Sequence, residues 1–282
     1  IRRDPNMRLS RRQFVGLIGA AGLSGCARLG LDKVADKVKS VDMMPGSPGK
    51  VTFAAIGDIH VLDARSTGIV NNAMAKINAN PDVRFTVMCG DLATDGNWSE
   101  LKLAKSSLDR LERPYFSIPG NHDVCMKTKD IYANYRKCFD ESDWRHEDEG
   151  WLFMGIDSTN EAKSDVSIRP DQIEWIEKQL KQTNAKRPIA LFSHHPFNPN
   201  TKAYRVQNAD EVLGLFSGHN LKLVAAGHFH GNQEETRDGI LFTTTSCCST
   251  TRGNHDGTTS KGYRLFHIEK ETITTEYVEV MA

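Results

Sequence analysis

Five short apolar runs in this chain each end in side chains that can bind a ligand or move a proton. The runs cover residues 51–56, 85–89, 115–118, 189–193 and 221–226. A continuous apolar run of about four to eight residues is typical of a strand that is buried on both faces. Carboxylate, amide or imidazole groups follow each run directly. Because ligands of open α/β sheets bind outside the carboxyl ends of the strands, the pattern predicts one shared site at these strand ends.

Apolar residues at helical spacing separate most of these runs. They predict helices over residues 66–79, 99–111, 127–139, 170–182 and 210–216, with Ser99 as an N-cap and Pro170 in a first turn. Strands that alternate with helices are typical of parallel βαβ units. A further strand is predicted over residues 151–156. After residue 230 the pattern changes to paired strands, at 233–236 with 240–244 and at 262–268 with 272–278.

The polar groups at the strand ends follow one another in a definite order. They are Gly57-Asp58-Ile59-His60, Gly90-Asp91, Gly120-Asn121-His122-Asp123, His194-His195-Pro196 and Gly227-His228-Phe229-His230. Each block alone is more often a turn or a hydrogen-bonded structural residue than a ligand set. Packing alone gives no reason for such groups at all five strand ends. The complete order resembles the pattern of the calcineurin-like metallophosphoesterase superfamily, and the resemblance covers residues 51–230.

That resemblance implies a fold and a metal centre. The fold would be α/β, a four-layer αββα sandwich of two mixed β-sheets, with residues 51–282 as one domain. Asp, Asn and His ligands without thiolate suit Fe, Mn or Zn. By resemblance, one of two metal ions would be held by Asp58, His60, Asp91 and His230, and the other by Asp91, Asn121, His194 and His228. His194 is preferred to His195 because the family's ligand lies two residues before the proline.

The resemblance also implies a reaction. Two cations about 3.5 to 4 Å apart can lower the pKa of a shared water and bind the attacking and leaving oxygens at phosphorus. The expected function is hydrolysis of phosphomonoesters or phosphodiesters by in-line attack of a metal-bridging hydroxide. His122, which is next to a ligand, would assist departure of the alkoxide or neutralise phosphoryl charge. Either Asp95 or Asp123 would orient His122, and the sequence leaves that choice open.

The first 26 residues resemble an export signal. Ser10-Arg11-Arg12-Gln13-Phe14-Val15 resembles a twin-arginine motif, and Leu23-Ser24-Gly25-Cys26 resembles a lipobox, where bacterial lipoproteins are acylated on the cysteine. The apolar run between them is shorter than the roughly 20 residues that span a bilayer. We therefore expect residues 1–26 to be a signal and the turn-rich residues 27–50 to be a tether. The protein would be exported to the periplasm or cell envelope and would touch the membrane only through a lipid anchor at Cys26.

The net charge of the chain bears on which class of substrate is expected. Lys and Arg total 36, as do Asp and Glu, but residues 1–25 hold five arginines and one aspartate, so the remainder carries a formal charge of −4. Such a domain lacks the basic track that nucleic-acid backbones require. A small-molecule phosphoester is therefore expected as substrate rather than nucleic acid. The alternatives are an exported nuclease and a non-catalytic envelope lipoprotein that binds only metal or a phosphorylated ligand.

Two loops are expected to border the site, at residues 198–207 and 246–261. They contain side chains that can bind phosphate, namely Lys202, Tyr204, Arg205, Arg252, Asn254 and His255. Basic residues on a surface are more often simply solvated. Nucleotides, glycerophosphodiesters, sugar phosphates and lipid headgroups all remain open as substrates. The spacing of Cys125 and Cys138 also leaves a disulfide open.

Overall fold

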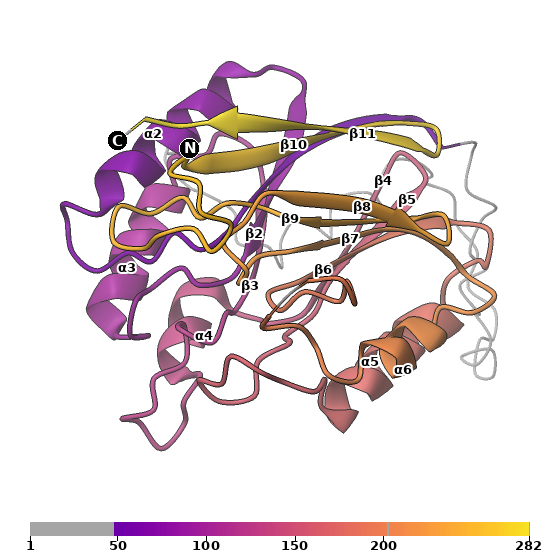
Figure 1. Cartoon of the computed structure of the whole chain (residues 1–282), viewed down its shortest axis with the longest axis horizontal. Helices are drawn as coiled ribbons and strands as arrows, with labels where there is room; N and C mark the ends of the chain where they lie inside the picture. The colour runs from indigo at the N-terminus through magenta and orange to yellow at the C-terminus, as the bar shows by residue number, and fades with distance from the viewer. Residues whose placement is uncertain (1–47, 202, 282) are drawn as a thin grey trace, which may run out of the picture. The chain divides into compact units, whose positions relative to one another are not determined.

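The computed structural model of the protein describes residues 48–201 and 203–281, which contain two mixed β-sheets (Figure 1). The first sheet has the order β11 (Thr272–Glu279), β10 (Gly262–Glu269), β1 (Lys50–Ile56), β2 (Val83–Cys89) and β3 (Tyr115–Ile118). The second has the order β4 (Trp144–Asp148), β5 (Trp151–Gly155), β6 (Pro188–Ser193), β7 (Asn220–Ala226), β9 (Ile240–Thr244) and β8 (Gln233–Arg237). The inner strands of both sheets are parallel, and β4, β8, β10 and β11 pair antiparallel. The signal and tether predicted for the N-terminal region lie almost wholly in residues 1–47, outside the described residues.

Three apolar cores hold four layers together. Helices α2 (Thr67–Ala79), α3 (Trp98–Leu108) and α4 (Ala133–Phe139) pack on the outer face of the first sheet, and α5 (Pro170–Lys181) and α6 (Ala209–Gly214) on that of the second (Figure 1). The third core lies between the sheets. The predicted αββα sandwich is confirmed.

Aromatic rings fix the two sheets against each other. Phe53 of β1 stacks on Phe85 and Phe266 of its own sheet, at centroid distances of 5.1 and 4.8 Å. Its edge contacts Phe153 and Phe192 of the second sheet at 5.5 and 5.7 Å. Such pairs contribute about 0.5–1.5 kcal/mol each beyond the area that they bury. The strand ends of one sheet are therefore held in a fixed position relative to those of the other.

Two local predictions were wrong, and one strand was missed. Helix α3 begins at Trp98 after Asn97, so Ser99 is not its N-cap, and the helix ends at Leu108. Helix α4 begins only at Ala133, because the preceding residues form a loop in which Cys125 N donates to Ile131 O at 2.8 Å. Strand β4 was not predicted. It is an edge strand in which only alternate residues, such as Trp144, face the core, and this pattern is too short to be distinctive.

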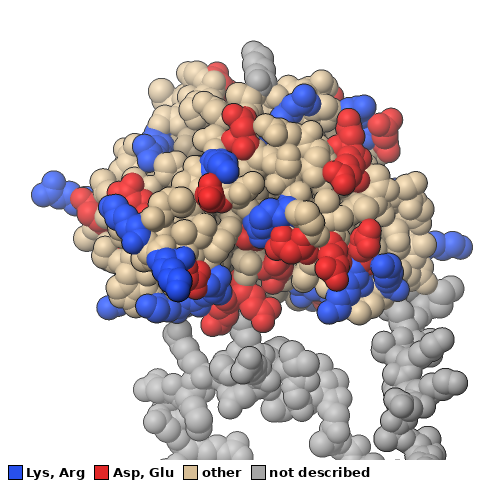
Figure 2. Space-filling model, turned by 90° about the horizontal axis from the view of Figure 1, so that it is seen from below, with Lys and Arg blue, Asp and Glu red and all other residues tan. Residues whose placement is uncertain are grey.

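The surface charges and the cysteines do not change the function expected from the sequence. Basic and acidic side chains are intermixed on the face seen in Figure 2. No helix among residues 48–201 and 203–281 is both long enough and apolar enough to cross a bilayer. All the cysteines of this region are free thiols, so the disulfide between Cys125 and Cys138 is absent here.

Candidate metal centre

Hydrogen bonds between loops join the strand ends of the two sheets. In the first sheet, Asp58 N donates to Gly90 O at 2.9 Å, so the loops after β1 and β2 run side by side. Across the sheets, His228 N donates to both carboxylate oxygens of Asp58 at 3.0 Å. His194 Nδ1 likewise donates to Cys89 O at 2.8 Å. The five strand ends therefore meet at one place, although they belong to two sheets rather than one.

Four buried side chains form a first cluster at this place. Asp58, His60, Asp91 and His230 each offer one ligand atom, and these atoms all lie within 4.8 Å of one another. His60 Nε2 is 3.1 Å from His230 Nε2 and 3.4 Å from Asp91 Oδ2. His230 Nε2 is 3.2 Å from Asp58 Oδ1.

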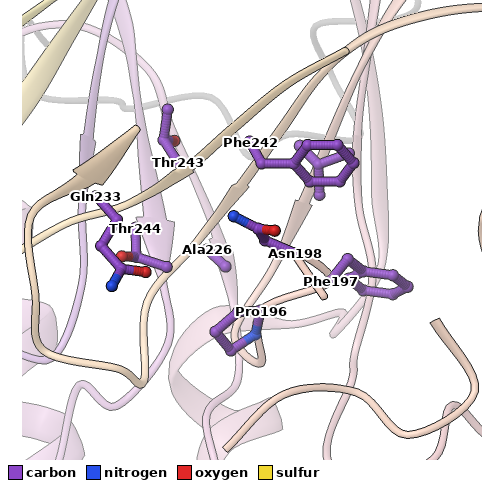
Figure 3. Close-up of a pocket in the computed structure, with 9 residues that line it drawn as sticks. Pro196, Phe197, Asn198, Ala226, Gln233, Phe242, Thr243 and Thr244 are labelled. Carbon is purple, nitrogen blue, oxygen red and sulfur yellow. The ribbon is translucent and has the colours of Figure 1, made fainter. Parts of the chain in front are cut away.

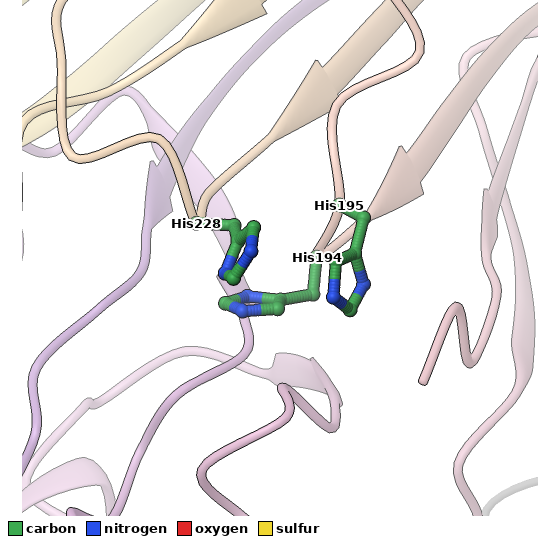
Figure 4. Close-up of side chains that lie close together, drawn as sticks. All are labelled: His194, His195 and His228. Carbon is green, nitrogen blue, oxygen red and sulfur yellow. The ribbon is translucent and has the colours of Figure 1, made fainter. Parts of the chain in front are cut away.

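A second cluster lies on the other side of Asp91. It consists of His194, His195 and His228 at the ends of β6 and β7 (Figure 4). His194 Nε2 is 3.1 Å from Asn121 Oδ1 and 3.3 Å from Asp91 Oδ1. Asp91 thus turns Oδ2 toward the first cluster and Oδ1 toward the second.

His194 and His195 have different surroundings. Both ring nitrogens of His195 have partners away from the carboxylates, since Nδ1 lies 2.9 Å from Ser158 Oγ and Nε2 lies 3.3 Å from Lys163 O. The His195 ring packs on His228 at a centroid distance of 4.4 Å. The contacts therefore favour His194 as the ligand and give His195 a supporting position behind His228.

The donor set fits metal cations. Asp58 and Asp91 are both 1% exposed and form no ion pair with a lysine or arginine within the described part of the chain. Buried carboxylates require a compensating positive charge. The ring nitrogen His60 Nδ1 is buried without a hydrogen-bond partner among the described residues. Carboxylate, amide and imidazole groups without thiolate suit Fe, Mn or Zn.

The imidazole pKa values agree with this assignment. Burial lowers the pKa of His60 to about 4 and that of His228 to about 3, which leaves both rings neutral and able to bind a metal. Burial acts in the same direction on His194 and His230, but Asp91 raises the pKa of His194 to about 9 and Asp58 raises that of His230 to about 11. Without metal, protons on these two rings therefore balance the carboxylates, and cations would replace those protons.

Five of the eleven non-glycine residues with positive φ in the described part of the chain are proposed ligands. The φ angles of Asp58, His60, Asp91, His228 and His230 are 55°, 40°, 52°, 64° and 46°. Residues other than glycine seldom adopt positive φ, and each such residue costs on the order of 1 kcal/mol or more. Tight turns at the strand ends therefore aim these side chains inward at the expense of local stability.

His122 is oriented by a backbone carbonyl. Its Nδ1 donates to Thr94 O at 2.7 Å, and its own backbone N–H donates to Asp91 Oδ1 at 2.9 Å. The expectation that Asp95 or Asp123 orients this ring is therefore corrected. No sequence signal marks a carbonyl, because every residue has one.

Asp123 has a different role in the structure. Its carboxylate accepts hydrogen bonds at 2.8 Å from the backbone N–H groups of Leu92, Ala93 and Gly120. These bonds tie the loop after β2 to the loop after β3. Asp123 thus fixes the spacing between the segments that carry Asp91 and Asn121.

A pocket of about 320 Å³ opens over both clusters. Its lining includes residues of the predicted centre and of the two predicted loops: His60, Asp91, His122, Ser164, Tyr204, His228, His230, Arg252, Gly253, Asn254 and His255. Ser164 was not anticipated, because nothing in its sequence context marks it. Arg205 does not line the pocket and donates to Pro199 O, and Lys202 is not described.

A second, much smaller cavity lies beside the turn that follows β6. Its volume is about 10 Å³, and Pro196, Asn198, Gln233 and Thr244 are among its lining residues (Figure 3). That space holds about one water molecule. The large pocket is therefore the candidate substrate site.

Two mixed sheets that bring carboxylate, amide and imidazole groups together under an open pocket form an arrangement that suits metal-dependent chemistry on phosphate esters. The chain belongs to the calcineurin-like phosphoesterase family, whose model matches residues 51–232. The resemblance inferred from the five motifs is thereby confirmed.

Individual relatives are distant. A protein of Xenorhabdus bovienii named as a probable cyclic nucleotide phosphodiesterase is 26% identical over 153 residues, which are 53% of this chain and 62% of that protein. This chain thus matches less than two thirds of that relative. A probable glycerophosphodiester phosphodiesterase of Arcobacter nitrofigilis is 26% identical over 200 residues, 65% of this chain and 67% of that one. Purple acid phosphatase from yellow lupin superposes with a TM-score of 0.66 at 13% identity over 83% of this chain and 52% of that chain, which shows the fold alone.

Proposed function

We propose that the protein is a dinuclear metal-dependent phosphodiesterase that acts on small molecules. The single observation that supports two metal ions best is the position of Asp91, with one carboxylate oxygen 3.4 Å from His60 Nε2 and the other 3.3 Å from His194 Nε2. A carboxylate shared in this way can bridge two cations. Both relatives described above are named as phosphodiesterases, and this favours diesters over monoesters.

The ligands divide into two sets around Asp91. Asp58, His60, Asp91 and His230 would hold one ion, and Asp91, Asn121, His194 and His228 the other. When bound, such ions lower the pKa of water and stabilise negative charge at phosphorus. Hydrogen bonds that restrain the ligands, such as His194 Nδ1 to Cys89 O, keep the donor atoms directed at the centre.

His122 would transfer the proton to the leaving oxygen. Because Nδ1 donates to Thr94 O, the tautomer and ring angle are set and Nε2 remains as the atom available to the substrate. His122 also lines the pocket. A protonated Nε2 can therefore donate to the departing alkoxide without any metal ligand being moved.

Turnover tests this proposal directly. The purified chain would be stripped with a chelator, reloaded with Fe, Mn or Zn, and assayed with bis(p-nitrophenyl) phosphate, a cyclic nucleotide and a glycerophosphodiester. We expect turnover only after reloading, with two equivalents of metal bound. Two bound equivalents without turnover of any ester would support the non-catalytic binding alternative instead.

We also propose that the enzyme acts in the cell envelope, attached through Cys26. The support is the paired Arg11-Arg12 motif followed at the expected distance by Leu23-Ser24-Gly25-Cys26. The intermixed surface charges in Figure 2 give no reason to add a second membrane contact on that face.

A further inference from the structure

One permanently charged cation, Arg252, lines the large pocket. It is the only lysine or arginine among the lining residues. Within the described part of the chain, its guanidinium makes no hydrogen bond or ion pair. Other partly buried arginines are paired, for example Arg169 with Asp157 and Arg264 with Glu234. A guanidinium without a partner in an active-site pocket is available to an anionic ligand.

Hydrogen bonds to residues of the candidate metal centre hold the loop that carries Arg252 in place. Thr251 Oγ1 donates to His60 O at 3.1 Å, and His255 N donates to His230 O at 3.0 Å. His230 Nδ1 in turn donates to Gly253 O at 2.9 Å. Arg252 is therefore presented at a fixed position beside two of the proposed ligands.

Contacts on the outer side of the loop complete this support. Lys261 Nζ donates to Arg252 O at 2.7 Å and lies 3.0 Å from Cys247 Sγ. Asn254 Oδ1 accepts from Cys247 N at 3.2 Å, while Asn254 Nδ2 donates to Ser260 O at 2.7 Å. A loop with such internal bonding loses little backbone entropy when one of its side chains binds a ligand.

We propose that Arg252 binds the non-bridging oxygens of a phosphoryl group in the pocket, and that this contact contributes more to the binding of a dianionic phosphate than to that of a monoanionic one. A guanidinium presents a planar fork of donors that matches two phosphate oxygens. The rings of Tyr204 and His255, whose centroids are 5.5 Å apart, also line the pocket and suit the uncharged part of a substrate. The inference rests on the proposed function only in placing a phosphoryl group in this pocket.

The charge of each substrate sets the loss of kcat/KM that is expected when Arg252 is replaced. At pH 8 p-nitrophenyl phosphate is a dianion and bis(p-nitrophenyl) phosphate is a monoanion. Coulomb energy scales with charge, so the loss for the monoanion should be about half of that for the dianion in free energy. Arg252→Met should lower kcat/KM by about 10- to 100-fold for the dianion and by about 3- to 10-fold for the monoanion. Binding of inorganic phosphate to the metal-loaded protein should weaken by a factor similar to that of the dianion.

Two further variants serve as controls. Arg237→Met removes a positive charge at the end of β8 that lies away from His230. It should leave kcat/KM for both substrates and the affinity for phosphate unchanged. Arg252→Lys keeps the positive charge but loses the planar pair of guanidinium donors. It should therefore retain the wild-type ratio of kcat/KM between the two substrates while weakening phosphate binding a few-fold. It also continues the test if Arg252→Met does not fold. Metal content is measured for every variant.

The outcomes separate this inference from the proposed function. An equal fall for both substrates, a loss of metal, or no change in phosphate binding would overturn the role of Arg252. If the wild-type protein hydrolyses neither ester, the proposed function fails. Calorimetry with inorganic phosphate would still decide the inference, since weaker binding by Arg252→Met with full metal content supports it and unchanged binding refutes it.

Discussion

A single methyl group added at Gly120 should disable the centre. A Cβ atom there would lie 2.1 Å from Asp91 Oδ1 and 2.3 Å from Asp91 N. Carbon and its non-bonded neighbours normally approach to about 3.5 Å, so Asp91 would have to move by more than about 1 Å. The loop of Gly120 cannot easily yield, because its N–H donates to Asp123 Oδ2 at 2.8 Å. A 1 Å displacement in an active site can reduce the rate by about 10²-fold.

The assay measures metal content, turnover and unfolding of Gly120→Ala. We expect a folded protein that binds less metal and turns over at least about 10²-fold more slowly. Gly68→Ala is the matched control, since no atom lies within 4 Å of its added Cβ. In helix α2 that change should raise the free energy of unfolding by about 0.5–1 kcal/mol and leave metal content unaltered. Full metal content and wild-type turnover in Gly120→Ala would refute the assignment of Asp91.

Three further predictions concern the centre and the N-terminal segment. Asp91→Ala should abolish activity and lose more bound metal than His230→Ala does, because Asp91 is proposed to contact both ions. Elemental analysis that finds two full equivalents of metal in Asp91→Ala would exclude Asp91 as a bridging ligand. His122→Asn should keep its metal but lose about 10²- to 10⁴-fold in turnover, with a larger loss for alkoxide than for nitrophenolate leaving groups. An equal loss for both would mean that His122 only positions the site. Cys26→Ser should release the protein from membranes or block its processing, and finding the unprocessed wild-type protein in the cytosol would contradict the anchor.

The sequence predicted best the features that depend on local pattern. The apolar runs before Asp58, Asp91 and Asn121 became β1, β2 and β3, because a short apolar run bounded by turn residues has few alternatives to a strand. The order of the motifs identified the family, and the residues of these motifs include every proposed ligand. Both hairpins after His230 were also found, since alternating strands around a turn such as Asp238-Gly239 are a local signal.

Features that depend on the rest of the fold were predicted less well. The orientation of His122 depends on Thr94 O, a carbonyl whose position only the packed loops determine. The start of α4 was placed too early because the bond from Cys125 N to Ile131 O overrides the helical pattern before Ala133. The support of Arg252 likewise comes from backbone atoms of His60 and His230, which sequence spacing does not reveal.

The positive φ angles of the proposed ligands have a consequence for engineering. Glycine adopts such angles at little cost, but His60→Gly or His228→Gly would also leave a cavity in place of a buried ring, and that cavity costs more than the strain that is relieved. A screen that rewards thermal stability alone, carried out without metal, would therefore keep a bulky side chain at these positions but would not distinguish a ligand from another residue of similar size. Metal in the screening buffer would make that distinction, because an ion that binds only the folded chain stabilises it in proportion to the logarithm of its concentration.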